Sequence, residues 1–127
     1  MTNEVKLTKS QVKQWTEAMR SGRYRQITGT WISAAHLRSG GSPLKEGERP
    51  TEDNPCFACA MGVLNHAVLT DHRFYDSAMW AGRRAHDMKL SSCLSRTVMC
   101  KNDNEQASFD EIADFVEDTI LPLAEED

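Results

Sequence analysis

Apolar residues recur at helical spacing near the start of the chain. Thr8 followed by Gln11 is the pattern of a capping box, and Ser21-Gly22 supplies a glycine suited to end a helix. This spacing predicts a first helix between these two signals, and its apolar stripe consists of Val12, Trp15, Ala18 and Met19.

A second helical pattern begins in the middle of the chain. Asn54 is a suitable cap and Pro55 suits the first helical position. We expect this to be the central buried helix, with a stripe of Phe57, Met61, Leu64 and Val68. A shorter third helix is predicted from about residue 76 to about residue 86, and the segment 93–100 is compatible with either a strand or a helix.

The last helix has the clearest signals. Ser108 and Glu111 form a second capping box, and Pro122 ends the pattern. One face is apolar, through Phe109, Ile112, Ala113, Val116 and Ile120.

Residues 23–32 are rich in β-formers, with Gly29 as a possible bend, and they predict one or two short strands. Residues 33–54 are rich in Gly, Ser, Pro and charge, so we expect a mobile loop there. The order of elements predicts an α+β fold with about four helices and a small antiparallel sheet, in a single compact domain over residues 1–127.

Composition and charge narrow the function classes. The chain is 39% hydrophobic and 27% charged, as in ordinary globular domains. The longest uncharged run, 54–70, is too short and too polar to span a membrane, and no export signal is visible, so we expect a cytoplasmic protein without a membrane partner. The net charge is −4, and we therefore do not expect nucleic acid as a partner.

The four cysteines leave two chemical hypotheses open. Cys59 lies near a predicted helix start, where a helix dipole favours a thiolate, so it is the candidate nucleophile of a cysteine-dependent hydrolase or transferase. The base would be His36, His72 or His86, since His66 is seven residues away along the same helix. Alternatively, a small zinc module would use Cys56, Cys59, Cys93 and Cys100. Buried, inert thiols with no cofactor are the simpler interpretation.

A basic segment follows the first helix. Arginine forks and an aromatic face in this segment could grip a phosphate, a nucleotide or an acidic protein surface. The candidate binding residues are Arg20, Tyr24, Arg25 and Gln26, accompanied by Arg23.

Three motifs are spread along the chain: W-x-x-A-[LM]-R-S-G-x-Y-x-Q at residues 15–26, C-x-[LM]-G-V-L at 59–64, and S-F-x-E-I-A-D at 108–114. With these motifs, much of the chain resembles a family of short, mostly uncharacterised phage and bacterial proteins. Shorter matches are Trp80-Ala81-Gly82 and Asn102-Asp103, and Ala60 stands where the family has a second cysteine.

The resemblance implies a phage setting and a common fold, without an established activity. By analogy with other small phage proteins, we expect an accessory protein that binds a host macromolecule or a signalling nucleotide and acts as a counter-defence inhibitor. We expect a binding protein in preference to an enzyme. Its partner would be a host protein or a small anionic ligand.

Overall fold

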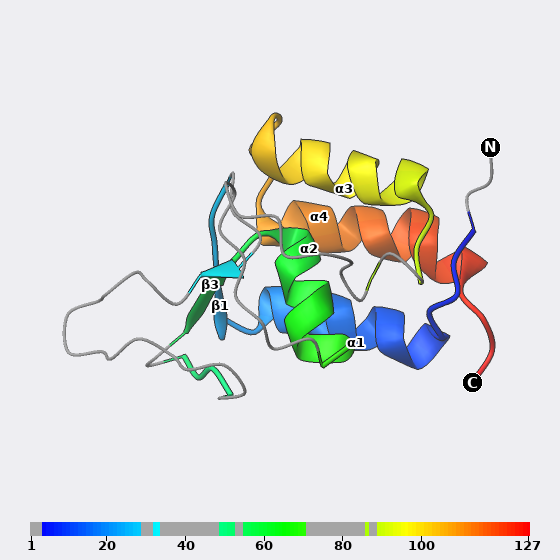
Figure 1. Cartoon of the computed structure of the whole chain (residues 1–127), viewed down its shortest axis with the longest axis horizontal. Helices are drawn as coiled ribbons and strands as arrows, with labels where there is room; N and C mark the ends of the chain where they lie inside the picture. The colour runs from blue at the N-terminus through cyan, green and yellow to red at the C-terminus, as the bar shows by residue number, and fades with distance from the viewer. Residues whose placement is uncertain (1–3, 29–31, 34–48, 53–54, 71–85, 87–88) are drawn as a thin grey trace.

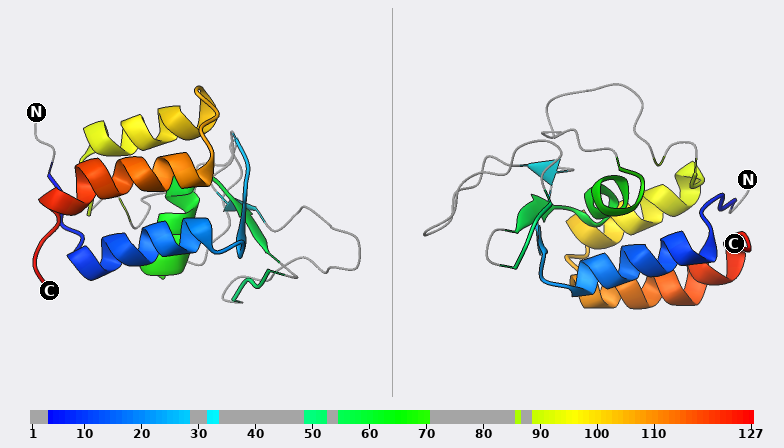
Figure 2. Two further views of the ribbon diagram at one scale, coloured as in Figure 1. Left: turned by 180° about the vertical axis from the view of Figure 1, so that it is seen from behind. Right: turned by 90° about the horizontal axis from the view of Figure 1, so that it is seen from below.

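The computed structural model describes residues 4–28, 32–33, 49–52, 55–70, 86 and 89–127. Three helices, α1 (Lys9–Arg20), α3 (Ser92–Asp103) and α4 (Phe109–Phe115), lie side by side, with α4 antiparallel to the other two (Figure 1). The short helix α2 (Ala60–Val63) runs across them, and a small sheet lies at one end of the helices (Figure 2).

The predicted first helix is confirmed. Thr8 Oγ1 accepts from the Gln11 backbone N–H at 3.2 Å and Gln11 Oε1 accepts from the Thr8 N–H at 3.0 Å, so the capping box is complete. Trp15 is fully buried and its indole Nε1–H donates to the Ala60 carbonyl at 2.9 Å, which ties α1 to α2. Gly22 adopts a φ of +84°, and this left-handed turn leads the chain from α1 into the sheet.

The sheet contains β1 (Tyr24–Gln26), β2 (Ile32–Ser33) and β3 (Cys56–Ala58), in the order β1-β3-β2. The prediction of short strands within 23–32 is confirmed. The prediction of an antiparallel sheet is wrong, because β1 and β3 run parallel, with Tyr24 opposite Cys56, and only β2 pairs antiparallel with β3. The central strand, β3, comes from a segment that the sequence pattern assigned to a helix. Because β3 runs parallel to β1, a long connection joins the two strands, and a hairpin could not.

The central helix therefore begins later than predicted. Residues 56–58 are a strand, and the cap is Cys59, whose φ and ψ of −82° and 174° are extended. Met61 and Leu64 are fully buried as expected, while Phe57 lies in β3. After α2 the helix widens into a π-helical turn, η1 (Leu64–Val68). Residues 76–85 of the predicted third helix, and residues 34–48 and 53–54 of the predicted loop, lie outside the described residues.

The sequence pattern of 93–100 is compatible with either a strand or a helix, and in the structure this segment belongs to α3. The capping box at Ser108 and Glu111 is confirmed for α4. This helix continues into a π-helical turn, η3 (Val116–Ile120), and a 3-10 turn, η4 (Leu121–Leu123), which contains Pro122. In the part of the chain that the structure describes, no helix has the length and apolar character needed to cross a membrane.

Candidate functional site

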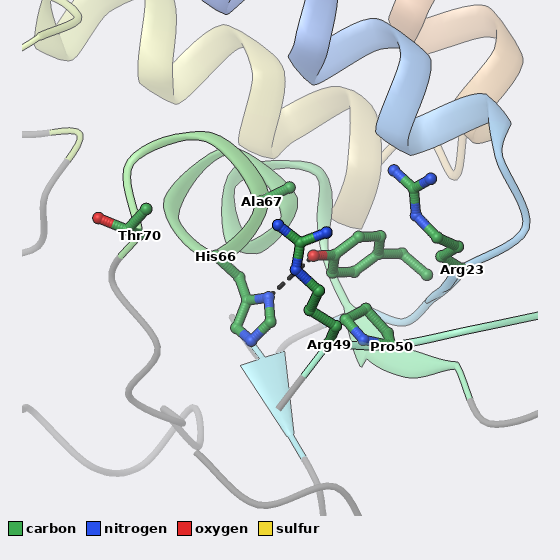
Figure 3. A pocket seen from close by; sticks show the side chains of 7 residues that line it. Arg23, Arg49, Pro50, His66, Ala67 and Thr70 are labelled. Carbon is green, nitrogen blue, oxygen red and sulfur yellow. Dashed lines mark hydrogen bonds between the residues drawn. The ribbon is translucent and has the colours of Figure 1, made fainter. Parts of the chain in front are cut away.

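A pocket of about 340 Å³ opens between β1, the segment before β3 and the central helix. Its lining comes from three separate parts of the chain (Figure 3). The residues that line it are Arg23, Tyr24, Arg49, Pro50, His66, Ala67 and Thr70. The volume lies at the lower end of the range of small-molecule sites.

Tyr24 and His66 are joined inside this pocket. The Tyr24 hydroxyl and His66 Nδ1 are 2.8 Å apart, and the two rings meet edge to face with centroids 5.7 Å apart. Both residues are buried, at 5% and 3% exposure. Burial raises the pKa of Tyr24 well above its ordinary range, so this side chain is a neutral phenol throughout the physiological pH range.

Two arginines give the pocket a positive charge. Arg23 and Arg49 both act on the Tyr24 hydroxyl, and both oppose the rise of its pKa. In Figure 3 the Arg49 side chain extends toward the helical segment that carries His66 and Ala67. The described lining includes no carboxylate. Arg23 does meet Glu17 outside the pocket, at 3.4 Å, but both side chains are exposed, and such pairs are weak.

The helical segment that carries His66 has unusual geometry. His66 lies within the π-helical turn η1, and such turns occur frequently at functional sites. Just after it, Thr70 has a φ of +54°, which is rare for a β-branched residue. Thr70 lines the pocket, and its hydroxyl, which Figure 3 shows turned away from the other lining side chains, donates to the Leu69 carbonyl at 2.7 Å. Irregular helix and strained backbone thus coincide at one wall of the pocket.

The structure separates the four binding residues that the sequence predicted. Only Tyr24 lines the pocket. Arg20 lies instead against the last helical segment, where its guanidinium donates to Asp114 in α4 at 2.7 Å and to Glu117 in η3 at 2.8 Å. Arg25 is exposed, one residue after Tyr24 along β1 and hence on the opposite face of the strand.

Gln26 also has a different role from the one predicted. Its Nε2 donates to the Ala107 carbonyl at 2.6 Å and to Asn102 Oδ1 at 3.0 Å. Asn102 is 1% exposed and accepts from the Ala60 backbone N–H at 3.1 Å as well. The amide nitrogen of Gln26 therefore joins β1 to α3 and to the segment before α4.

Cys59 has the environment of a structural thiol. It is buried, and its Sγ accepts from the Gly62 backbone N–H at 3.4 Å as the cap of α2. Burial raises the pKa of the Cys59 thiol to about 11, whereas a nucleophilic cysteine needs a lowered pKa. Of the candidate bases, His86 pairs with Asn65, with His86 Nδ1 3.1 Å from Asn65 Nδ2, and His36 and His72 lie outside the described residues.

The four cysteines do not gather into one site. Cys56 and Cys59 are buried, Cys93 is exposed and Cys100 is partly exposed. Cys93 and Cys100 are seven residues apart on α3, hence about 10.5 Å along the helix axis, too far to share one ion. Within the described ranges, no three His, Cys, Asp or Glu side chains form a group that could hold a metal ion.

The sequence interpretation missed Arg49 and Pro50, and it considered His66 only as a partner for Cys59. The parallel pairing of β1 with β3 brings these residues beside Tyr24. No local pattern encodes that pairing, because it joins segments about 30 residues apart in the sequence.

No protein-family model matches the chain, and neither a curated protein nor a solved structure is similar enough to match it. The resemblance to short phage and bacterial proteins therefore stays a prediction from the sequence pattern.

Proposed function

We propose that this chain is a binding protein for a small anionic ligand that carries a phosphoryl group. The observation that carries the proposal is the pocket with Arg23 and Arg49 at its lining and no carboxylate among its described lining residues. Guanidinium groups bind phosphate oxygens with two parallel N–H donors, and these charge-assisted hydrogen bonds are the strong ones.

The other lining residues suit such a ligand. Tyr24, His66 and Thr70 add polar groups, and Pro50 and Ala67 add apolar surface for the rest of a small molecule. Small-molecule sites fix the orientation of a ligand with a small number of placed polar groups. The proposal includes binding and no catalytic step.

This proposal keeps one of the two partners expected from the sequence and relocates its site. A signalling nucleotide remains a suitable ligand, and a role against a host defence in a phage setting remains a prediction. The ligand would contact Arg23 and Arg49 and not Arg20, Arg25 or Gln26, since Arg20 and Gln26 are held by other parts of the chain.

The test compares three arginine variants. Isotope-labelled protein is titrated with inorganic phosphate, AMP and a cyclic dinucleotide, and binding is followed by backbone amide shifts in NMR spectra. We expect Arg23→Gln and Arg49→Gln each to weaken binding of the best probe about tenfold or more, because a charged hydrogen bond contributes roughly 1.5–3 kcal/mol.

Arg25→Gln is the matched control. It removes the same charge from the same strand region, but Arg25 does not line the pocket. Equal losses of affinity in all three variants would mean that only the net charge of the protein matters for binding. They would contradict the assignment of the ligand to this pocket. A lack of response to every phosphorylated probe would overturn the proposed function itself.

A further inference from the structure

The Tyr24–His66 hydrogen bond controls what the pocket can donate to a ligand. A neutral phenol has one hydrogen to donate, and burial keeps Tyr24 in that form. If His66 Nδ1 accepts this hydrogen across the 2.8 Å contact, the Tyr24 oxygen presents only lone pairs toward the pocket. That arrangement repels an anion.

Protonation of His66 reverses the direction of this hydrogen bond. In the imidazolium both ring nitrogens carry hydrogen, so Nδ1–H donates to the Tyr24 oxygen, and the phenol hydrogen is released for a ligand. The neutral tautomer with hydrogen on Nδ1 would also release it, but only the imidazolium adds positive charge beside the ligand. Anion binding therefore favours the charged form.

The charges around His66 make this protonation depend on the ligand. Among the described residues, the charged groups that line the pocket are Arg23 and Arg49, both cations, and the thiol of Cys56 acts on Tyr24 from β3. In the empty pocket the two arginines oppose a third positive charge. A bound dianion removes that opposition, because opposite charges favour the charged form of a neighbouring group.

We propose that anion binding in this pocket is coupled to the uptake of one proton from the solvent by the His66 imidazole, through its hydrogen bond to Tyr24. This inference rests on the proposed function and adds its regulation. Histidine ordinarily titrates near pH 6.5. The ligand would therefore be bound more tightly in mildly acidic solution and released as the pH rises.

Sulfate is the probe of choice, because it stays a dianion across the whole range and any pH dependence then comes from the protein. Its Kd is measured by NMR titration between pH 5.5 and 8.5, and the ring nitrogens of His66 are followed in the same samples. For the full chain we expect Kd to rise several-fold across the range, up to the tenfold per pH unit that one coupled proton permits. Sulfate should also raise the protonated fraction of His66 at pH 7, whereas the ring of His86, held by Asn65, should not change.

His66→Asn is the matched variant, since its amide can still donate to the Tyr24 oxygen but does not titrate. It should bind sulfate with a Kd that no longer depends on pH. In Tyr24→Phe, which lacks the hydroxyl, sulfate should bind more weakly and His66 should respond less to it. Circular dichroism checks that both variants are folded. If a variant does not fold, the change in the protonated fraction of His66 on sulfate binding in the unmodified chain decides whether the proton coupling exists.

Sulfate binding with a constant Kd and an unchanged His66 would overturn the proton coupling and leave the anion site intact. If neither sulfate nor any phosphorylated probe binds at any pH, both the coupling and the proposed function fail. The two failures are therefore distinguishable.

Discussion

Cys59 illustrates how one residue can suit two opposite interpretations from sequence. Its position at the start of a helix was predicted correctly, since it is the cap of α2. A helix start favours a thiolate only where solvent or a cation stabilises the charge, and this thiol is buried. Desolvation wins over the helix dipole, so the pKa rises to about 11.

The thiols should consequently react at very different rates. With an aromatic disulfide reagent at pH 8, we expect Cys93, which is exposed, to be labelled within minutes. Cys59 should be labelled only as fast as the protein opens, because its Sγ is both buried and protonated. Mass spectrometry of peptides from timed samples assigns each site.

A Cys93→Ser variant provides the control, since it should abolish the fast phase without changing the slow one. Labelling of Cys59 in the native protein as fast as a free cysteine would contradict the structural role and return the cysteine-dependent enzyme to consideration.

At the scale of elements, sequence periodicity predicted α1 and α4 well, left the segment of α3 open between strand and helix, and predicted the centre of the chain poorly. In α1 and α4 the capping boxes and apolar stripes agree with each other and with the structure. In 55–68 an apolar run suits either a buried strand or a helix, and the chain forms both in succession, β3 and then α2. No sequence signal distinguishes the two π-helical turns, η1 and η3, from regular helix.

The contact between α1 and α4 is partly electrostatic. Arg20 donates to both Glu117 carboxylate oxygens and to Asp114, and its side chain is about one-third exposed, at 35%. The hydrogen bond from Arg20 lowers the pKa of Glu117. Arg20, one of the predicted binding residues, is thus better described as a surface link between two helices.

We expect Arg20→Ala to reduce the free energy of unfolding by about 0.5–1 kcal/mol at neutral pH and low salt, because exposed ion pairs contribute little. Since the folded-state pKa of Glu117 is lowered, this contribution is full above the ordinary carboxyl pKa and disappears as the pH falls through the lowered value. Urea denaturation at several pH values, combined with Glu117→Gln in a double-mutant cycle, measures it.

The difference in the free energy of unfolding between the unmodified protein and Arg20→Ala should shrink in high salt and at acidic pH. A loss of 2 kcal/mol or more, or one that grows as the pH falls, would contradict the assignment of this pair as a weak surface link.

At the scale of the whole molecule, side-chain amide groups help to join the sheet to the helices. Asn102 in α3 donates to the Ile27 carbonyl at 2.8 Å, and its Oδ1 accepts from Ala60 N–H and from Gln26. In the sequence, Asn102 belongs only to the short family match Asn102-Asp103. Its role could not be predicted, because its partners lie about 40 and 75 residues away along the chain.

Asn102→Ala should therefore destabilise the protein by about 3 kcal/mol, since it leaves the buried Ala60 N–H and the Ile27 carbonyl without this partner. The measurement is the urea midpoint, with the denaturant slope checked for constancy. Asn104→Ala is the control: Asn104 is exposed just after α3, and we expect a change within about 0.5 kcal/mol.

If Asn102→Ala and Asn104→Ala had the same free energy of unfolding, the hydrogen bonds of Asn102 would not contribute to stability, and the prediction would be wrong.

The two ends of the described chain are fastened together. The Glu125 N–H donates to the Leu7 carbonyl and the Lys9 N–H to the Glu125 carbonyl, both at 2.9 Å. Figure 1 shows both ends at the side of the helices opposite the sheet. An affinity tag or a surface anchor attached at either end would therefore hold the molecule with the arginine-lined pocket directed toward solution. Ligand screens on immobilised protein thus suit this architecture, and swapping the anchor from one end to the other should leave the measured affinities unchanged.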